Sequence, residues 1–217
     1  MLELSAVSKS YVIKDRQIEV LKNVSLKIPR GEFVAVLGRS GSGKSTLLSL
    51  MSGLDVPSSG VIRFDGVEIQ SMNEDELTLF RRDRMGFVFQ SYHLIPSLNA
   101  LENVLLPLEL ANKRKDFGRA KDLLEMVGLK DRMNHRPSEL SGGEQQRLSI
   151  CRAVVHRPAF IFADEPTGNL DTNNGQVVMN LLREMKENST LIMVTHDRAL
   201  ANESHRQIEI RDGEIFE

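Results

Sequence analysis

One glycine-rich segment constrains the fold more than any other part of this sequence. It reads Gly38-Arg39-Ser40-Gly41-Ser42-Gly43-Lys44-Ser45 and matches the phosphate-binding loop pattern in full. The apolar run 34–37 before it predicts a buried strand, and residues 44–54 after it have helical periodicity. A Gly/Ser-rich turn can arise by chance, but the order strand, loop, helix favours a phosphate site in an α/β fold.

The residue types of this loop suit phosphate chemistry. Glycines let the backbone approach phosphate oxygens closely, and the N–H groups at the start of the next helix attract anions. Lys44 is expected to reach the β- and γ-phosphates, and the Ser45 hydroxyl is expected to ligate Mg²⁺. The predicted nucleotide-binding residues of this segment are Gly38, Arg39, Ser40, Gly41, Ser42, Gly43, Lys44, Ser45 and Thr46.

Composition narrows the class of protein. With 41% hydrophobic and 27% charged residues, the 217-residue chain is expected to be globular. Its net charge of -2 favours neither nucleic acid nor an anionic membrane as a direct partner. No apolar run approaches the roughly 20 residues that cross a bilayer, so no membrane insertion is expected. The acidic start at Glu3 and the single Cys151 favour a cytoplasmic location without disulfides.

Strand and helix signals alternate along the chain. Strand signals mark five segments: 2–7, 18–26, 34–37, 160–163 and 191–194. Helical periodicity marks four: 44–54, 119–127, 143–156 and 175–186. The last three strand segments are apolar throughout, which predicts a parallel sheet buried on both faces. Asn73, followed by three acidic residues, predicts a capped helix to about Arg84, and residues 91–136 read as helical.

Two acidic residues follow one of the buried strands. Asp164 and Glu165 come directly after residues 160–163, at the strand end where ligands of open α/β sheets collect. Asp164 is expected to hold Mg²⁺, and Glu165 is expected to polarise the attacking water as general base. Alone, the pair could be two solvated acids before a proline turn, but beside a phosphate loop the catalytic interpretation is favoured.

A further motif points to a family. The segment Leu140-Ser141-Gly142-Gly143-Glu144-Gln145-Gln146-Arg147 resembles the signature motif of ATP-binding-cassette (ABC) proteins. The other family motifs stand in order: Tyr11, Gln90 after Phe87-Val88-Phe89, Gly168-Asn169-Leu170-Asp171, and His196. The resemblance covers essentially the whole chain.

The resemblance implies a specific architecture. The expected fold is an α/β phosphate-loop NTPase of the ABC nucleotide-binding type, with a mixed sheet core, an N-terminal antiparallel β subdomain and an inserted α-helical subdomain. Residues 1–217 would form a single ABC ATPase domain. Within it, about 1–90 and 157–217 would make the RecA-like core, and about 91–156 the helical subdomain.

The resemblance also implies roles for residues. Tyr11 would stack on adenine, and the catalytic set would be Glu165, His196, Gln90 and Lys44. Mg²⁺ would be held by Ser45, Gln90 and Asp164. The signature residues Ser141, Gly142, Gly143 and Glu144, with Asp171, would face the ATP of a second copy of the chain. ATP and Mg²⁺ are thus the expected cofactors, and an ATP-sandwich homodimer the expected assembly.

Short motifs suggest a subgroup. Residues 89–104, 134–139 and 163–171 resemble the ATP-binding subunits of lipoprotein-releasing, macrolide-efflux and antimicrobial-peptide-resistance systems. Lipoprotein release is the first expectation, with macrolide or peptide efflux as the alternative. Residues 91–108 are the expected docking surface for a separate membrane permease, which would hold the chain at the cytoplasmic face of the inner membrane.

Two other function classes remain as alternatives. An ABC ATPase of DNA repair or translation usually carries two cassettes or a long coiled-coil insert, and neither is visible in this sequence. A regulatory scaffold of a cell-envelope complex, as in cell-division relatives, is the other. The intact Glu165 favours a competent enzyme.

Overall fold

The computed structural model describes residues 1–113, 116–168, 170, 172–186 and 189–216. The chain forms two compact units, Met1–Arg81 with Thr190–Glu217, and Arg82–Ser189. Within the described ranges, no helix has the length and apolar character that a membrane span requires.

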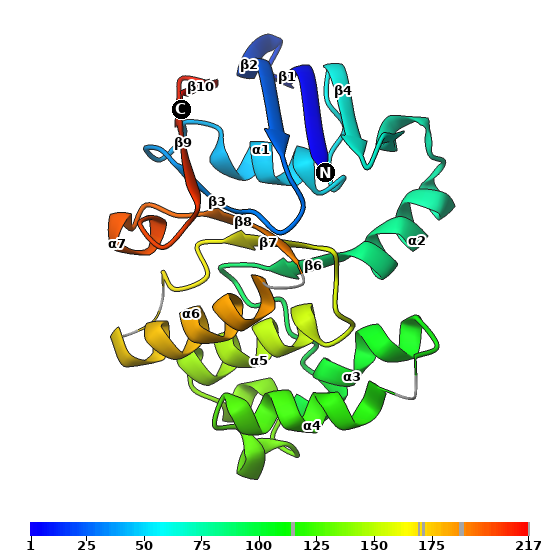
Figure 1. Cartoon of the computed structure of the whole chain (residues 1–217), viewed down its shortest axis with the longest axis vertical. Coiled ribbons are helices and arrows are strands. Elements are labelled where there is room, and N and C mark those ends of the chain that lie inside the picture. The colour runs from blue at the N-terminus through cyan, green and yellow to red at the C-terminus, as the bar shows by residue number, and fades with distance from the viewer. Residues whose placement is uncertain (114–115, 169, 171, 187–188, 217) are drawn as a thin grey trace. The chain divides into compact units, whose positions relative to one another are not determined.

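The first unit contains an antiparallel sheet of four strands (Figure 1). In the order β2-β1-β4-β5 these are Arg16–Ile28, Leu2–Ile13, Ser59–Phe64 and Val67–Glu68. Leu2, Leu4 and Val7 of β1 are all buried. In a regular strand Val7 would point to the opposite face from Leu2 and Leu4, because side chains alternate between the two faces. A register shift lies between Leu4 and Val7, and Ala6 there has a left-handed φ of 51°. This bulge turns Val7 back toward the buried face.

The same unit contains four strands of a second, mixed sheet of six strands. These strands in the order β10-β9-β3-β8 are Glu214–Phe216, Arg206–Arg211, Phe33–Leu37 and Thr190–Val194. Strand β3 runs parallel to both β8 and β9, while β10 is antiparallel to β9. Every residue of β8 is buried, as the apolar run predicted. Helices α1 (Lys44–Met51) and α7 (Arg198–Ala201) contact β8 and β3 respectively.

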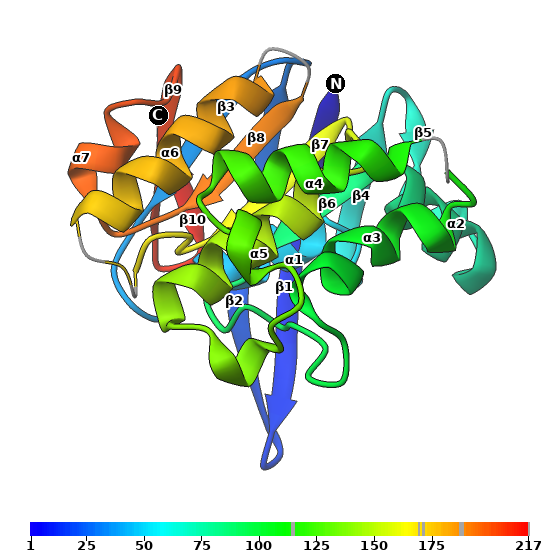
Figure 2. The same ribbon diagram turned by 90° about the horizontal axis from the view of Figure 1, so that it is seen from below.

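The second unit is mainly helical (Figure 2). Its strands β6 (Met85–Val88) and β7 (Phe160–Asp164) are parallel. The helices are α3 (Ala100–Leu110), α4 (Phe117–Met126), α5 (Gly142–Val154) and α6 (Thr172–Lys186), with 3-10 turns η3 (Lys130–Arg132) and η4 (Pro137–Glu139). Helix α5 contacts the other three helices and β6, and Leu148, Ile150 and Cys151 on it are fully buried. It is the central element of this unit.

The predicted capped helix is present as α2 (Glu74–Arg84), after the 3-10 turn η1 (Ile69–Ser71). Asn73 Oδ1 accepts a hydrogen bond from the Glu76 amide at 2.9 Å, and the Glu76 carboxylate accepts one from the Asn73 amide at 2.9 Å. This reciprocal pair satisfies two N–H groups at the start of the helix.

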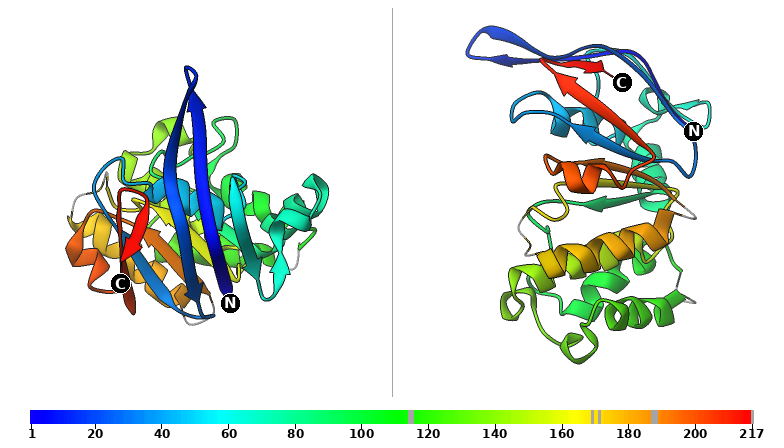
Figure 3. Two further views of the ribbon diagram at one scale, coloured as in Figure 1. Left: turned by 90° about the horizontal axis from the view of Figure 1, so that it is seen from above. Right: turned by 60° about the vertical axis from the view of Figure 1, so that its left-hand side comes forward.

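The N-terminal strands are longer than the sequence pattern predicts. Strand β1 continues to Ile13, and β2 begins at Arg16. The loop end of the hairpin that they form projects beyond the other strands of its unit (Figure 3). Residues 11–19 are exposed, so this extension has no buried face to produce an apolar alternation.

Candidate functional site

The glycine-rich loop connects β3 to α1, and glycine is needed at two of its positions. A Cβ on Gly38 would lie 2.5 Å from the Ile210 carbonyl oxygen and 2.6 Å from Ser42 Oγ. Gly43 has a φ of 106°, and a Cβ there would lie 3.0 Å from both the Val20 carbonyl oxygen and Leu21 Cδ2. Gly43 therefore allows β2 of the N-terminal hairpin to pack directly on the loop.

The start of α1 is arranged to receive an anion. Gly43 is the N-cap residue, and among the described residues no side chain caps this helix. Its first N–H groups are therefore left for a ligand or water. Lys44 Nζ donates to the carbonyl oxygens of Gly38 and Arg39, each at 2.9 Å, so the ammonium lies over the loop. Ser45 is exposed and Thr46 is half-buried.

Tyr11 lies in the same unit and is held by a polar network. Its hydroxyl donates to Asp55 Oδ2 at 2.7 Å, and Lys9 Nζ lies 4.8 Å from the centre of its ring. Burial and the hydrogen bond to Asp55 raise the pKa of Tyr11, while the Thr46 hydroxyl acts in the opposite direction. Tyr11 is therefore neutral and close to the first turn of α1.

His196 stands at the carboxyl edge of the mixed sheet. Val36 of β3 pairs with Val194 of β8, and the Thr195 amide donates to the Val36 carbonyl at 3.2 Å. Because the two strands are parallel, the exposed His196 and Gly38 follow strand ends at the same edge. The first unit thus brings together Tyr11, the glycine-rich loop and His196.

The second unit brings the acidic pair and Gln90 together in the same way. Val88 of β6 pairs with Ala163 of β7, so Gln90 and Asp164 follow neighbouring parallel strand ends. A Cβ on Gly168 would lie 3.6 Å from the Glu165 Cβ and 3.8 Å from Gln90 Nε2. Gln90 and Glu165 are therefore neighbours across Gly168.

Glu165 has an unusual backbone. Its φ of 47° lies in the left-handed region, which costs a non-glycine residue about 1–3 kcal/mol. The Gly168 amide donates to its carbonyl at 3.1 Å and closes the turn after β7. Strain of this kind is common at functional sites, where it fixes a side chain in one place.

The signature segment begins α5 with a capping box. Ser141 Oγ accepts from the Glu144 amide at 3.3 Å, and Glu144 Oε2 accepts from the Ser141 amide at 2.7 Å. The backbone hydrogen bond from Ser141 lowers the pKa of Glu144. Gly142 is exposed and Gly143 half-exposed, so both glycines border solvent. Asp171 lies outside the described residues.

Several residues around the candidate site were not identified from the sequence. Asp55 and Lys9 hold Tyr11 through contacts that cross from one strand to a distant loop. In the second unit, Arg152 of α5 donates to the carbonyls of Tyr92 and His93 at 2.9 and 2.6 Å. Both carbonyls belong to residues with left-handed φ, so Arg152 fixes the turn that follows Gln90. Neither arrangement forms a local motif.

The donors predicted for a metal fit Mg²⁺ by their chemistry. Ser45, Gln90 and Asp164 offer a hydroxyl, an amide and a carboxylate oxygen, and Mg²⁺ prefers oxygen ligands. Within the described part of the chain, no three His, Cys, Asp or Glu residues are grouped to hold an ion. This donor set suits a cation that is held mostly by phosphate oxygens and water.

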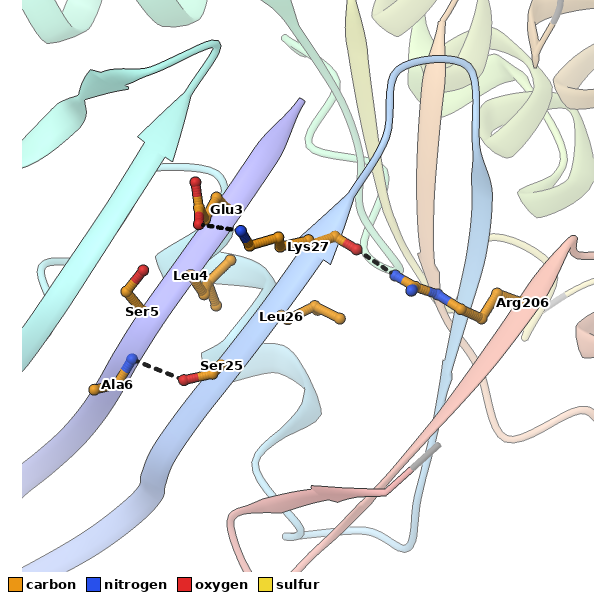
Figure 4. Close-up of a pocket in the computed structure, with 8 residues that line it drawn as sticks. All are labelled: Glu3, Leu4, Ser5, Ala6, Ser25, Leu26, Lys27 and Arg206. Atoms are coloured by element: carbon orange, nitrogen blue, oxygen red, sulfur yellow. Dashed lines mark hydrogen bonds and ion pairs between the residues drawn. The ribbon is translucent and has the colours of Figure 1, made fainter.

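A separate hollow of 540 Å³ lies on the antiparallel sheet and Arg206 (Figure 4). It contains none of the predicted site residues. Lys27 Nζ lies 2.9 Å from Glu3 Oε1, and Arg206 donates to the Lys27 carbonyl at 2.6 Å. These contacts hold strand edges together, and the hollow is not part of the candidate site.

Comparison with known proteins identifies the family. The family model described as ABC transporter matches residues 21–168. An uncharacterized ABC transporter ATP-binding protein of Methanocaldococcus jannaschii is 50% identical, over 100% of this chain and 98% of its own length. The macrolide export ATP-binding/permease protein MacB of Escherichia coli is 49% identical over 100% of this chain and 34% of its own length. The chain thus spans about a third of the MacB relatives.

Solved structures agree with this result. A dimeric structure of the ABC transporter cassette MJ0796 has a TM-score of 0.94 and 43% identity, covering 100% of this chain and 97% of that chain. A dimeric post-hydrolysis state of the same cassette, bound to ADP and Pi, has a TM-score of 0.93. The predicted α/β ABC fold is confirmed, and the chain belongs to the ABC transporter family as an ATP-binding domain that hydrolyses ATP.

Proposed function

We propose that this ATPase binds MgATP through the glycine-rich loop and Tyr11 and uses hydrolysis to drive a membrane permease. The observation that carries the proposal is the loop itself, with Lys44 folded over it and an α1 start that no described side chain caps. The backbone amides from Gly38 to Thr46 would bind the phosphate oxygens, and Lys44 would move from the loop carbonyls to the β- and γ-phosphates.

The hydrolytic step is assigned to three side chains. Glu165 would polarise the attacking water, Gln90 would orient it, and His196 would contact the γ-phosphate. Bound Mg²⁺ would neutralise charge on the β- and γ-phosphates, with Ser45, Gln90 and Asp164 as its protein ligands. The closeness of Gln90 and Glu165 across Gly168 supports this assignment.

We further propose an ATP-sandwich homodimer. The exposed Gly142 and half-exposed Gly143 would present the start of α5 to the γ-phosphate of a second copy, with Ser141, Glu144 and Asp171 beside it. Each nucleotide would then join both copies, and loss of the γ-phosphate would release them. The dimeric MJ0796 structures support this assembly.

The transported substrate would be bound by the permease and not by this chain. The MacB relatives favour export of a macrolide-like compound. Lipoprotein release is the second candidate, supported by the likeness of residues 89–104 to that subgroup. In either case residues 91–108 would dock on a separate permease subunit, which would hold this chain at the cytoplasmic face of the membrane.

Co-purification with the permease and an ATPase assay of the complex test this proposal. We expect the permease to be retained and the ATPase rate to rise when its substrate is added. Stimulation by macrolides and not by a lipoprotein supports export, and the reverse result supports lipoprotein release. A chain that purifies without any membrane subunit, and whose ATPase rate neither substrate changes, contradicts the transport role.

A further inference from the structure

The side chains of Lys9, Asp55 and Tyr11 form a connected polar network. Asp55 Oδ1 accepts from Lys9 Nζ at 2.6 Å and from the Val56 amide at 2.7 Å. Asp55 Oδ2 accepts from the Tyr11 hydroxyl at 2.7 Å. Both carboxylate oxygens are therefore engaged. Burial alone would raise the pKa of Asp55, but the hydrogen bonds from Lys9 and Tyr11 lower it, so the carboxylate stays ionised.

The network leaves the Tyr11 ring accessible while one face is covered. Lys9 Nζ lies over the ring, 4.8 Å from its centre, and donates to the Val56 carbonyl at 2.7 Å. The Lys9 side chain is only 12% exposed, whereas Tyr11 is 36% exposed. An ammonium on one face attracts the ring electrons, and a stacking partner must then take the other face.

Asp55 also ties this ring to the helix that begins in the glycine-rich loop. The amides of Leu54 and Asp55 both donate to the Ser49 carbonyl in α1, at 2.9 and 3.3 Å. Helix α1 starts at Lys44, so its first turn follows the glycine-rich loop directly, and the Ser49 carbonyl in its last turn holds the Asp55 backbone. The distance between ring and loop is therefore set at both ends of one helix.

We propose that Asp55 and Lys9 are positioning residues, which hold the Tyr11 ring so that a nucleobase stacks on its open face while the loop holds the phosphates. This inference rests on the proposed function, in which Tyr11 stacks on adenine. A ring that could rotate or slide would lose entropy when the base binds, and the network removes that cost before binding.

The test compares ATP with inorganic tripolyphosphate, which has no base and reports on the phosphate loop alone. Calorimetric titration measures both affinities in the full-length wild type, Asp55→Asn, Tyr11→Phe, Lys9→Met and the Asp55→Asn/Tyr11→Phe double variant. We expect each single variant to bind ATP about threefold to tenfold more weakly. Tripolyphosphate affinity should stay within about twofold of the wild type.

The double variant reports on the hydrogen bond directly. If Tyr11 and Asp55 act through one bond, the double variant should be no weaker toward ATP than the weaker single variant. Asp65→Asn is the matched control, because Asp65 is a paired and partly exposed carboxylate in the same unit that bonds to Arg30. It should bind ATP like the wild type.

The possible failures can be told apart. Wild-type ATP affinity in Asp55→Asn and Tyr11→Phe overturns the positioning role, as does an equal loss of ATP and tripolyphosphate binding in both variants. A wild type that binds ATP no better than tripolyphosphate overturns base stacking by Tyr11 and this inference with it. A wild type that binds neither ligand overturns the proposed function itself.

Discussion

At the scale of single residues, Gly43 joins the glycine-rich loop to the N-terminal hairpin. Its φ of 106° is costly for any other residue, and its missing side chain leaves room for Val20 and Leu21 of β2. Because Tyr11 lies on the other strand of that hairpin, the packing at Gly43 also sets where the ring stands relative to the loop.

Gly43→Ala tests this arrangement. The left-handed φ and the crowding at 3.0 Å should together lower the free energy of unfolding by about 2–5 kcal/mol. Gly31→Ala is the control, since Gly31 has a φ of 75° but nothing within 4 Å of an added Cβ, and it should cost about 1–2 kcal/mol. Urea denaturation measures both, and equal costs would show that the crowding is unimportant.

We expect His156 to make the stability of the second unit sensitive to pH. Its Nε2–H donates to the Met85 carbonyl at 3.0 Å, and its Nδ1 is buried with no hydrogen-bond partner in the described part of the chain. Burial lowers the pKa of His156, and Lys113 lowers it further, against opposite effects of the Met85 carbonyl and Asp83. The folded state therefore favours the neutral ring.

The sign of the pH effect follows from that depressed pKa. Stability from neutral His156 is fully present above the unfolded-state pKa of about 6.5, and it is lost as pH falls from there through the lower folded-state pKa. We expect the urea midpoint to fall between about pH 7.5 and 5.5, and to fall less in His156→Gln. Parallel pH profiles for the two proteins would contradict the assignment.

At the scale of elements, the start of α5 has a structural role, and we propose a functional role for the same residues. The Ser141–Glu144 capping box starts the helix that contacts α3, α4, α6 and β6. Another capping box, formed by Asn99 and Glu102, starts α3. The two boxes offer a comparison in which only one is proposed to touch nucleotide.

Ser141→Ala and Asn99→Ala make that comparison. Each should lower the free energy of unfolding by about 1 kcal/mol, because each removes one N-cap side chain. Only Ser141→Ala should also reduce steady-state ATPase activity strongly, if its hydroxyl meets the γ-phosphate of a second copy. A similar small loss of activity in both variants would limit Ser141 to a structural role.

The elements that sequence predicted best were those with local signals. The start of α2 at Asn73 and the buried strands β3, β7 and β8 follow from a cap and from unbroken apolar runs. Strand β9 was missed because only Ile208 and Ile210 are buried in it, between polar and charged residues. Its place beside β3 depends on pairing with a segment far away in sequence.

In the candidate site, too, the sequence identified the local features and missed those that depend on tertiary contacts. The glycine-rich loop, the acidic pair and the signature segment are contiguous, so spacing alone identified them. The left-handed φ of Glu165 and the contact of Asp55 with Tyr11 depend on tertiary structure, and no local pattern marks them.

At the scale of the whole molecule, the proposed function is that of an ATPase that works as a pair of copies. The division of residues 1–217 into a core and an insert of about 91–156 stays a prediction, as do the assigned catalytic roles. Glu165 is the residue on which those roles depend most, because it is the proposed general base.

Glu165→Gln is the most direct test of this account. Steady-state ATPase activity and molar mass by light scattering are measured with MgATP for the wild type, Glu165→Gln and the exposed control Glu125→Gln. We predict an ATPase rate at least about 100-fold lower in Glu165→Gln only, with ATP still bound and the dimer accumulating. Unchanged ATP hydrolysis in Glu165→Gln would contradict the central claim.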